Sequence, residues 1–274
     1  MPRRVQRLDA ELVRRGLARS REHARELIEG GRVQVHGVAA SKAATGVEQD
    51  ASVRVIADAD DPNYASRGAH KLVGALEQFA AIDVTGRRCL DAGASTGGFT
   101  DVLLRRGARE VVAVDVGYGQ LAWQLRSDAR VHVVDRTNVR TLTPDAIGGR
   151  ADITVADLSF ISLPLVLRAL ADCTAPDGDL LPMVKPQFEV GRDRLGSGGV
   201  VRDPLLRADA VVSVAHEAAR LGWPVHGVAR SPLPGPAGNV EFFLWLRRAD
   251  APTLTDDDIV TAVVAVAADD GGAP

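Results

Sequence analysis

The chain has 274 residues, of which 46% are hydrophobic and 25% charged, and its formal net charge is -3. This length allows a full hydrophobic core and one large domain with a small partner, at roughly 100 to 200 residues per domain. No apolar run reaches the ~18 residues that span a bilayer and the start MPRRVQRLDAEL lacks a signal-peptide core, so we expect a cytoplasmic protein. Two isolated cysteines, Cys89 and Cys173, and histidines without ligand spacing exclude a disulfide framework and predict no metal site.

The charge is unevenly distributed along the chain. Residues 1–56 hold eleven basic and seven acidic side chains, a balance of +4, which leaves -7 for the remainder. We call residues 1–56 the head and the remainder the body. The positive charge of the head favours contact with a polyanion, although a solvated arginine-rich surface explains the uneven charge equally well.

The head is expected to fold as two short helices and a small hairpin. Two apolar stripes at helical spacing predict the helices, the first at Leu8, Leu12 and Val13 and the second at Ala24, Leu27 and Ile28. Gly16 ends the first helix and Ser20 caps the second. Alternating apolar residues at 33–35 and 52–56 then predict strands.

The run SREHARELIEGGRVQVHGV resembles the alpha-L RNA-binding module of a small-subunit ribosomal protein and several pseudouridine synthases. We therefore expect residues 1–59 to form an RNA-binding domain. In that module arginines contact RNA phosphates and position the protein without reading the sequence of the RNA. The resemblance assigns this role to Arg4, Arg19, Arg21, Arg25, Arg32 and Arg67.

An acidic, proline-broken stretch separates the head from the body. We interpret residues 60–66 as an interdomain linker, residues 67–248 as the second domain and residues 249–274 as a C-terminal tail without an evident role. Lys71 then lies on a predicted amphipathic helix. On its own, such a lysine is more often a surface charge than a catalytic group.

The stretch RCLDAGASTGGFTDVL predicts a strand, a glycine-rich turn and a helix. Such a turn exposes backbone amides at a helix N-terminus, where a ligand can bind. Asp115 ends the next strand, 22 residues after Gly93, where doubly wound folds hold a ribose. A nicotinamide fingerprint requires a glycine at the place of Ser95, and the chain lacks the Gly-Lys pair of a P-loop.

The turn instead resembles the S-adenosylmethionine loop of class I methyltransferases. That resemblance implies S-adenosyl-L-methionine as cofactor, with Asp91 or the amides near Gly93 at its methionine end and Asp115 at its ribose. The cofactor-binding residues expected on this basis are Asp91, Gly93, Ser95, Thr96, Gly97, Gly98, Asp115 and Asp157.

Strands and helices continue to alternate beyond this turn. Strands are predicted at 131–135, 152–157 and 179–185, helices within SLPLVLRAL and LLRADAVVSVAHEAARLG, and a final strand pair in PVHGVARS and NVEFFLWLRR. This order predicts an α/β fold, a Rossmann-like class I methyltransferase sheet with an antiparallel last strand. The run 195–204 is either a mobile loop over the substrate or a plain surface connection.

Four charged residues at the predicted strand ends complete the pattern. Lys71, Asp157, Lys185 and Glu241 resemble the Lys-Asp-Lys-Glu tetrad of ribose methyltransferases related to FtsJ. With the head module and the motifs SRGAHKL, VDVGYGQL, ADLSFIS, VKPQFEVG and SPLPGPAGNVEF, the chain is similar to the TlyA family of ribosomal RNA 2'-O-methyltransferases, whose members are also called haemolysins. Taken individually, each of these charged residues is more readily explained by an interdomain or surface ion pair.

The resemblance implies methylation of a cytidine ribose in rRNA, and the basic N-terminus favours both ribosomal subunits as targets. Lys185 is the candidate base, Lys71 would orient the ribose, and Asp157 and Glu241 would orient the lysines. Four coupled groups leave open which lysine loses its proton. The run 62–65 departs from the family pattern, so it is assigned no role. The alternative functions are a non-catalytic RNA-binding protein and a membrane-active haemolysin-like protein.

Overall fold

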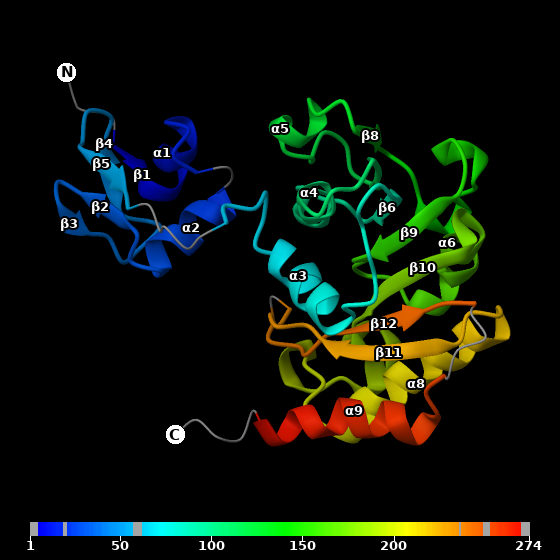
Figure 1. Ribbon diagram of the computed structural model, residues 1–274. Coiled ribbons are helices and arrows are strands. Elements are labelled where there is room, and N and C mark those ends of the chain that lie inside the picture. The colour runs from blue at the N-terminus through cyan, green and yellow to red at the C-terminus, as the bar shows by residue number, and fades with distance from the viewer. Residues whose placement is uncertain (1–4, 19–20, 57–61, 236, 249–252, 270–274) are drawn as a thin grey trace. The chain divides into compact units, whose positions relative to one another are not determined.

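The computed structural model describes residues 5–18, 21–56, 62–235, 237–248 and 253–269 (Figure 1). The chain divides into two compact units, Met1–Arg67 and Gly68–Pro274. Three positions named in the sequence analysis, Arg4, Arg19 and Ser20, lie outside the described residues.

The first unit combines two helices with two small antiparallel sheets. Its helices are α1 (Leu8–Arg14) and α2 (Arg21–Glu29), which the apolar stripes predicted. One sheet pairs β1 (Val5–Arg7) with β4 (Gly46–Glu48), and the other has the order β3 (Val38–Ala39), β2 (Val33–Val35), β5 (Val53–Val55). Both stripes pack into one core, in which Leu8, Leu12 and Ile28 are almost fully buried.

The second unit is built on a seven-stranded sheet of order β11-β12-β10-β9-β6-β7-β8. Every neighbouring pair is parallel except the two pairs that involve β12. This topology confirms the predicted fold, including its antiparallel last strand. The strands are β6 (Arg88–Ala92), β7 (Glu110–Val114), β8 (Val131–Val134), β9 (Ala151–Ala156), β10 (Thr174–Val184), β11 (Val225–Arg230) and β12 (Phe242–Leu246).

Helices cover both faces of this sheet. The helices α3 and α4 pack against each other on one face, and α6, α8 and α9 lie on the other (Figure 1). The bounds are α3 (Ala69–Gln78), α4 (Gly98–Arg105), α5 (Trp123–Arg126), α6 (Leu167–Cys173), α7 (Pro186–Glu189), α8 (Pro204–Arg220) and α9 (Asp256–Asp269). Short 3-10 turns lie at Val139–Thr141, Asp145–Ile147, Leu163–Leu165, Arg192–Arg194 and Ser197–Gly199.

One predicted helix is divided in the structure. The helix predicted within SLPLVLRAL consists of a 3-10 turn (Leu163–Leu165) and α6, because Val166 between them has a non-helical φ of -122°. The tail, in which the sequence predicts a short helix and a frayed end without an evident role, forms α9. Ile259 and Val263 on α9 are buried in the main core, so this helix is part of the packed unit.

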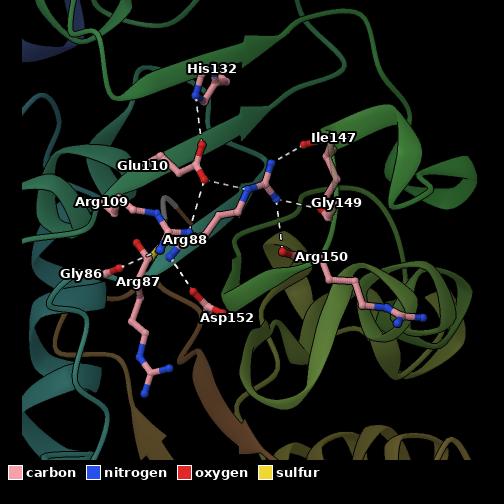
Figure 2. Close-up of polar contacts among 11 residues, drawn as sticks. Gly86, Arg87, Arg88, Arg109, Glu110, His132, Ile147, Gly149, Arg150 and Asp152 are labelled. Carbon is pink, nitrogen blue, oxygen red and sulfur yellow. Dashed lines mark hydrogen bonds and ion pairs between the residues drawn. The ribbon is translucent and has the colours of Figure 1, made fainter.

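The amino-terminal edge of the sheet is held together by Arg88 (Figure 2). Its guanidinium pairs with Glu110 at 3.0 Å and donates to the backbone oxygens of Ile147 and Gly149. Its backbone N–H donates to Asp152 Oδ2 at 2.8 Å. Arg88 therefore joins β6, β7, β9 and the turn before β9 at the end of the sheet that lies opposite the carboxyl edge.

Candidate active site

Four polar residues lie at the carboxyl edge of the sheet. Asp91 is the fourth residue of β6, and Asp115, Asp157 and Lys185 directly follow β7, β9 and β10. These strands run parallel, so their carboxyl ends lie along the edge where open α/β sheets bind ligands. The fold thus assembles residues that are far apart in the sequence.

Glu241 reaches the same edge from the opposite direction. Because β12 runs antiparallel to β10, the beginning of β12 lies beside the end of β10. Val184 pairs with Phe242, so the next residues outward are Lys185 and Glu241. The reversed direction of β12 is what brings Glu241 to the site.

Lys71 and Glu241 form a buried ion pair, with 2.5 Å between Nζ and Oε2. Their side chains are 11% and 1% exposed. The helix α3 can approach because its Gly74 lies against the ring of Pro232, and a Cβ on Gly235 would lie 2.6 Å from Glu241 Oε1. Two glycines therefore allow this ion pair to form.

Lys185 is the centre of a second polar group. Its Nζ donates a hydrogen bond to Ser159 Oγ at 3.0 Å. Asp157 Oδ1 lies 2.5 Å from the same nitrogen, as an ion pair outside hydrogen-bond angles. Lys185 is 7% exposed, whereas the Asp157 side chain is 23% exposed and Ser159 is exposed. The buried amine thus meets two acceptors that lie nearer the surface.

Glycine is required at two positions of the turn that follows β6. Gly93 has a φ of +89°, and a Cβ there would lie 2.5 Å from the backbone oxygen of Asp157. Gly97 has a φ of +96°, and a Cβ there would overlap the side chain of Leu125. Gly97 is the N-cap of α4, which begins at Gly98. The turn therefore holds α4 close to the loop that carries Asp157.

Asp115 is hydrogen-bonded to this turn. Its Oδ2 accepts the backbone N–H of Ser95 at 2.8 Å, and its Oδ1 accepts that of Gly117 at 2.6 Å. Ser95 has a left-handed φ of 47°, and the backbone oxygen of Thr96 accepts from Ala122. Each carboxylate oxygen has a second lone pair, which leaves Asp115 able to accept from a ribose hydroxyl.

Asp91 is fully buried beneath the turn. Its Oδ2 accepts a hydrogen bond from Thr100 Oγ1 on α4 at 2.7 Å. Burial raises the pKa of the Asp91 carboxyl to about 7, against the opposing effect of the Thr100 hydrogen bond. A carboxylate in this position is costly unless a further partner stabilises its charge.

The buried Asp91 Oδ1 has no hydrogen-bond partner within the described part of the chain, whereas Asp157 Oδ1 is held in its ion pair with Lys185. Buried polar atoms are nearly always hydrogen-bonded, so an external partner is expected for Asp91. S-adenosylmethionine carries positive charge on its sulfonium and its amino group, which suits this carboxylate. The residues present therefore fit this cofactor.

The cysteines play no part in this chemistry. Cys89 and Cys173 are buried free thiols, and burial raises their pKa values to about 12 and about 11. Among the described residues, no group of three histidine, cysteine, aspartate or glutamate side chains could hold a metal ion.

Comparison with known proteins decides the family. A model described as FtsJ-like methyltransferase matches residues 64–248, and an S4 domain model matches residues 6–53. The chain is 61% identical, over 96% of its length and 97% of the relative's, to the 16S/23S rRNA (cytidine-2'-O)-methyltransferase TlyA of Mycobacterium tuberculosis. The chain belongs to the TlyA family.

Other TlyA-like relatives have names that refer to haemolysis. Hemolysin A of Brachyspira hyodysenteriae is 33% identical over 86% of this chain and 97% of its own length. A solved candidate hemolysin of Streptococcus thermophilus is 36% identical, with a TM-score of 0.77, and covers 97% of this chain and 96% of that one. Within the described residues, no helix of the chain is long and apolar enough to cross a membrane.

Membership in the TlyA family confirms several predictions. The second unit is an FtsJ-like methyltransferase that uses S-adenosylmethionine, and the first is an S4 RNA-binding domain. RNA ribose methylation is therefore the activity of this chain, and rRNA is its substrate class.

In the S4 domain, three arginines surround one buried carboxylate. Asp9 has a fully buried side chain and accepts hydrogen bonds from Arg7 at 3.1 and 3.0 Å and from Arg21 at 3.0 Å. Arg25 lies 3.8 Å from the same carboxylate. The guanidinium groups remain about half exposed, so Asp9 presents three positive groups on one surface.

The other predicted RNA contacts differ in their setting. Arg32 donates to the backbone oxygen of Ile56, which ties the end of β5 to the helix-to-strand connection. Arg67 is the last residue of the first unit. Arg7, in contrast, belongs to the arginine group but was not selected from the sequence, because a single arginine before a helix carries no distinguishing pattern.

Two residues in the loop that follows β9 were also not predicted from the sequence. Ser159 contacts Lys185, and Phe160 is 92% exposed, with its ring centroid 5.4 Å from that of Phe188. An apolar pattern favours burial of a phenylalanine at this position. The left-handed φ of 63° at Phe160 accompanies an outward ring, and no sequence signal predicts that conformation.

Proposed function

We propose that this chain transfers a methyl group from S-adenosylmethionine to the 2'-hydroxyl of cytidines in both 16S and 23S rRNA, acting on ribosomal subunits in the cytoplasm. The substrate assignment is supported by 61% identity to a relative of that name. The structural support is the contact of Lys185 with Asp157 and Ser159 at the carboxyl edge, beside the glycine turn.

Lys185 is the proposed proton acceptor. A ribose hydroxyl keeps its proton at neutral pH, so its attack on a methyl group requires a positioned acceptor. Lys185 is buried, and its Nζ contacts Asp157 and Ser159, which lie nearer the surface. When bound, the cofactor supplies a methyl group on a cationic sulfur.

The second lysine has a different setting. Lys71 is paired at 2.5 Å with Glu241, whose side chain is 1% exposed. Lys71 can donate to the ribose oxygens. Asp157 and Glu241 orient the two lysines. Lys185 is the proposed base, because its partners Asp157 and Ser159 reach the surface, whereas Glu241, the partner of Lys71, is buried.

Residues in each of the two units would contact the RNA. In the S4 domain, Arg21 and Arg25 lie in the group around Asp9 and would contact phosphates, as would Arg4, Arg19, Arg32 and Arg67. In the methyltransferase unit, the exposed ring of Phe160 offers a surface on which the base of the target nucleotide can stack.

The test combines mapping with a single variant. Ribose methylation is mapped on 16S and 23S rRNA from cells with and without this protein, and one cytidine in each rRNA is expected to lose its methyl group. Lys185→Ala is expected to bind S-adenosylmethionine normally in calorimetry but to lose methyl transfer. Turnover within about tenfold of the parent enzyme would contradict the role of Lys185.

A further inference from the structure

Ser159 meets the amine of Lys185 at the surface of the active site. It lies two residues after Asp157 in the loop that follows β9 and is exposed, whereas Lys185 is buried. The distance from Lys185 Nζ to Ser159 Oγ is 3.0 Å. A surface hydroxyl therefore contacts the buried group that the proposed function makes the base.

The two acceptors of Lys185 act on it in different ways. Asp157 Oδ1 is close, at 2.5 Å, but lies outside hydrogen-bond angles. Ser159 is the acceptor of the hydrogen bond that Lys185 Nζ makes within the described part of the chain. Asp157 thus contributes charge, which is nearly independent of direction, and Ser159 contributes direction.

Direction matters for an amine that accepts a proton. A neutral amine has two N–H bonds and one lone pair, and rotation about the Cε–Nζ bond moves that lone pair among three staggered positions. A hydrogen bond to Ser159 fixes one N–H, and the negative charge of Asp157 disfavours a lone pair that points toward it. The lone pair is left with the third direction, away from both acceptors.

We propose that Ser159 is a positioning residue, which orients the amine of Lys185 toward the ribose 2'-hydroxyl. The proposal rests on the proposed function, because it takes Lys185 as the base. In the step itself, the proton of the 2'-hydroxyl passes to Lys185 Nζ while the ribose oxygen forms its bond to the methyl carbon and the carbon–sulfur bond breaks, with its electron pair left on sulfur. Ser159 neither gains nor loses a proton.

The test compares Ser159→Ala with Ser159→Thr in the full-length enzyme, using tritiated S-adenosylmethionine and unmethylated 23S rRNA. For Ser159→Ala we expect kcat to fall by up to about tenfold, the upper range for loss of a hydrogen bond between neutral groups. The KM for rRNA and the affinity for S-adenosylmethionine should stay within twofold. Ser159→Thr keeps the hydroxyl and should retain kcat within about threefold.

Ser127→Ala is the matched control, since Ser127 is exposed and its hydroxyl donates only to the backbone oxygen of Trp123 within the described residues. A kcat of Ser159→Ala within twofold of the parent overturns the proposal. A raised KM with unchanged kcat also overturns it, because Ser159 would then bind substrate rather than act through Lys185. If Ser159→Ala does not fold, Ser159→Cys carries the same expectation, since sulfur is a weak acceptor.

The experiment distinguishes failure of the Ser159 proposal from failure of the proposed function. If the parent enzyme methylates no rRNA, or if Lys185→Ala stays active, the proposed function fails. If the parent is active, Lys185→Ala is inactive and Ser159→Ala equals the parent, only the role of Ser159 fails.

Discussion

Gly74 on α3 lies in direct contact with Pro232 in the loop between β11 and β12: a Cβ at position 74 would lie 2.8 Å from Pro232 Cγ and 2.9 Å from Cδ. Lys71 lies one helical turn before Gly74, and its partner Glu241 follows the same loop. The closeness of helix and loop therefore sets the position of the Lys71 side chain relative to Glu241.

Substituting Gly74→Ala should separate the helix from the loop. Alanine improves helix propensity by ~1 kcal/mol, but overpacking against a rigid proline ring costs ~1–3 kcal/mol, so we expect a net loss of stability. We also expect methyl transfer to fall at least tenfold, because Lys71 moves with α3. Thermal unfolding and methyl-transfer assays check this, with Glu77→Ala on the exposed face of α3 as control. Full activity in Gly74→Ala would show that the pair tolerates a shift of the helix.

Asp91 gives the enzyme a pH-dependent stability. Its pKa of about 7 lies above the ordinary value of 3.8, so between about pH 4 and pH 7 the folded protein binds more protons than the unfolded chain. The contribution of Asp91 to the free energy of unfolding is therefore highest below pH 4 and falls as pH rises to 7. An amide at position 91 does not ionise, so substitution by asparagine removes this pH-dependent loss of stability.

We expect Asp91→Asn without cofactor to be more stable than the parent at pH 8, with a smaller difference at pH 5, since a buried amide costs less than a buried charge. Cofactor affinity should fall about tenfold or more, because a charged hydrogen-bond partner is lost. Thermal unfolding at both pH values and calorimetry with S-adenosylmethionine measure the two effects. Asp145→Asn on an exposed turn is the control. Unchanged affinity would limit Asp91 to a structural role.

Asp9 allows a test in which charge and geometry predict opposite results. Removing its charge in Asp9→Asn makes the S4 domain more positive, which by charge alone strengthens RNA binding. We expect the reverse, a several-fold weaker affinity, because Arg7 and Arg21 lose the charge of the carboxylate that holds them together. Fluorescence anisotropy with an rRNA fragment measures it. The control Glu29→Gln makes the same charge change on the exposed surface of α2. Tighter RNA binding by Asp9→Asn would show that net charge determines RNA affinity, and not the arrangement of the arginines around Asp9.

The same carboxylate also makes the S4 domain sensitive to acid. The hydrogen bond from Arg7 lowers the pKa of Asp9 to about 2, against the opposing effect of burial. Because the folded value lies below the unfolded value of 3.8, Asp9 stabilises the domain above pH 4, and this stabilisation is lost as pH falls toward 2. Acid unfolding of Asp9→Asn should lack this contribution.

Phe160 should matter for rRNA and not for the fold. Its ring is 92% exposed, so Phe160→Ala is expected to leave the melting temperature unchanged. Stacking of a base on an aromatic ring contributes ~1–3 kcal/mol, which corresponds to a loss of roughly 5- to 150-fold in kcat/KM for rRNA. Cofactor affinity should not change, and Phe160→Tyr should retain activity. A kcat/KM of Phe160→Ala equal to the parent's would exclude a stacking role.

The sheet and its ligand edge were predictable because their signals are local. Apolar runs that end at Asp91, Asp115 and Asp157 mark parallel strands, and parallel strands bring their carboxyl ends together. The length of β10 was not predictable. It begins at Thr174 rather than Asp179, because Pro176 and Gly178 give that segment the appearance of a turn, and an irregular register accommodates them.

Contacts that depend on the three-dimensional path of the chain were beyond the sequence. Nothing near Gly74 shows that Pro232 lies against it, 158 positions later in the chain. Ser159 and Phe160 follow a strand-end aspartate, but only the backbone conformation of the loop turns one toward Lys185 and the other outward. Local patterns therefore predicted that the strand-end aspartates lie along one edge of the sheet, whereas the contacts around them depend on tertiary packing.

The position of β12 between β10 and β11 also determines the order in which the enzyme can be completed during synthesis. β6 leads into the glycine turn, and it pairs with β7 and β9, which end at Asp115 and Asp157. All three strands precede β12 in the chain, so they can pair before β12 is synthesised. β11 is made earlier than β12 but forms an edge of the sheet only through pairing with it. One late strand thus joins β11 to the sheet and brings Glu241 to Lys71. A growing chain can form the glycine turn many residues before it can form the ion pair between Lys71 and Glu241.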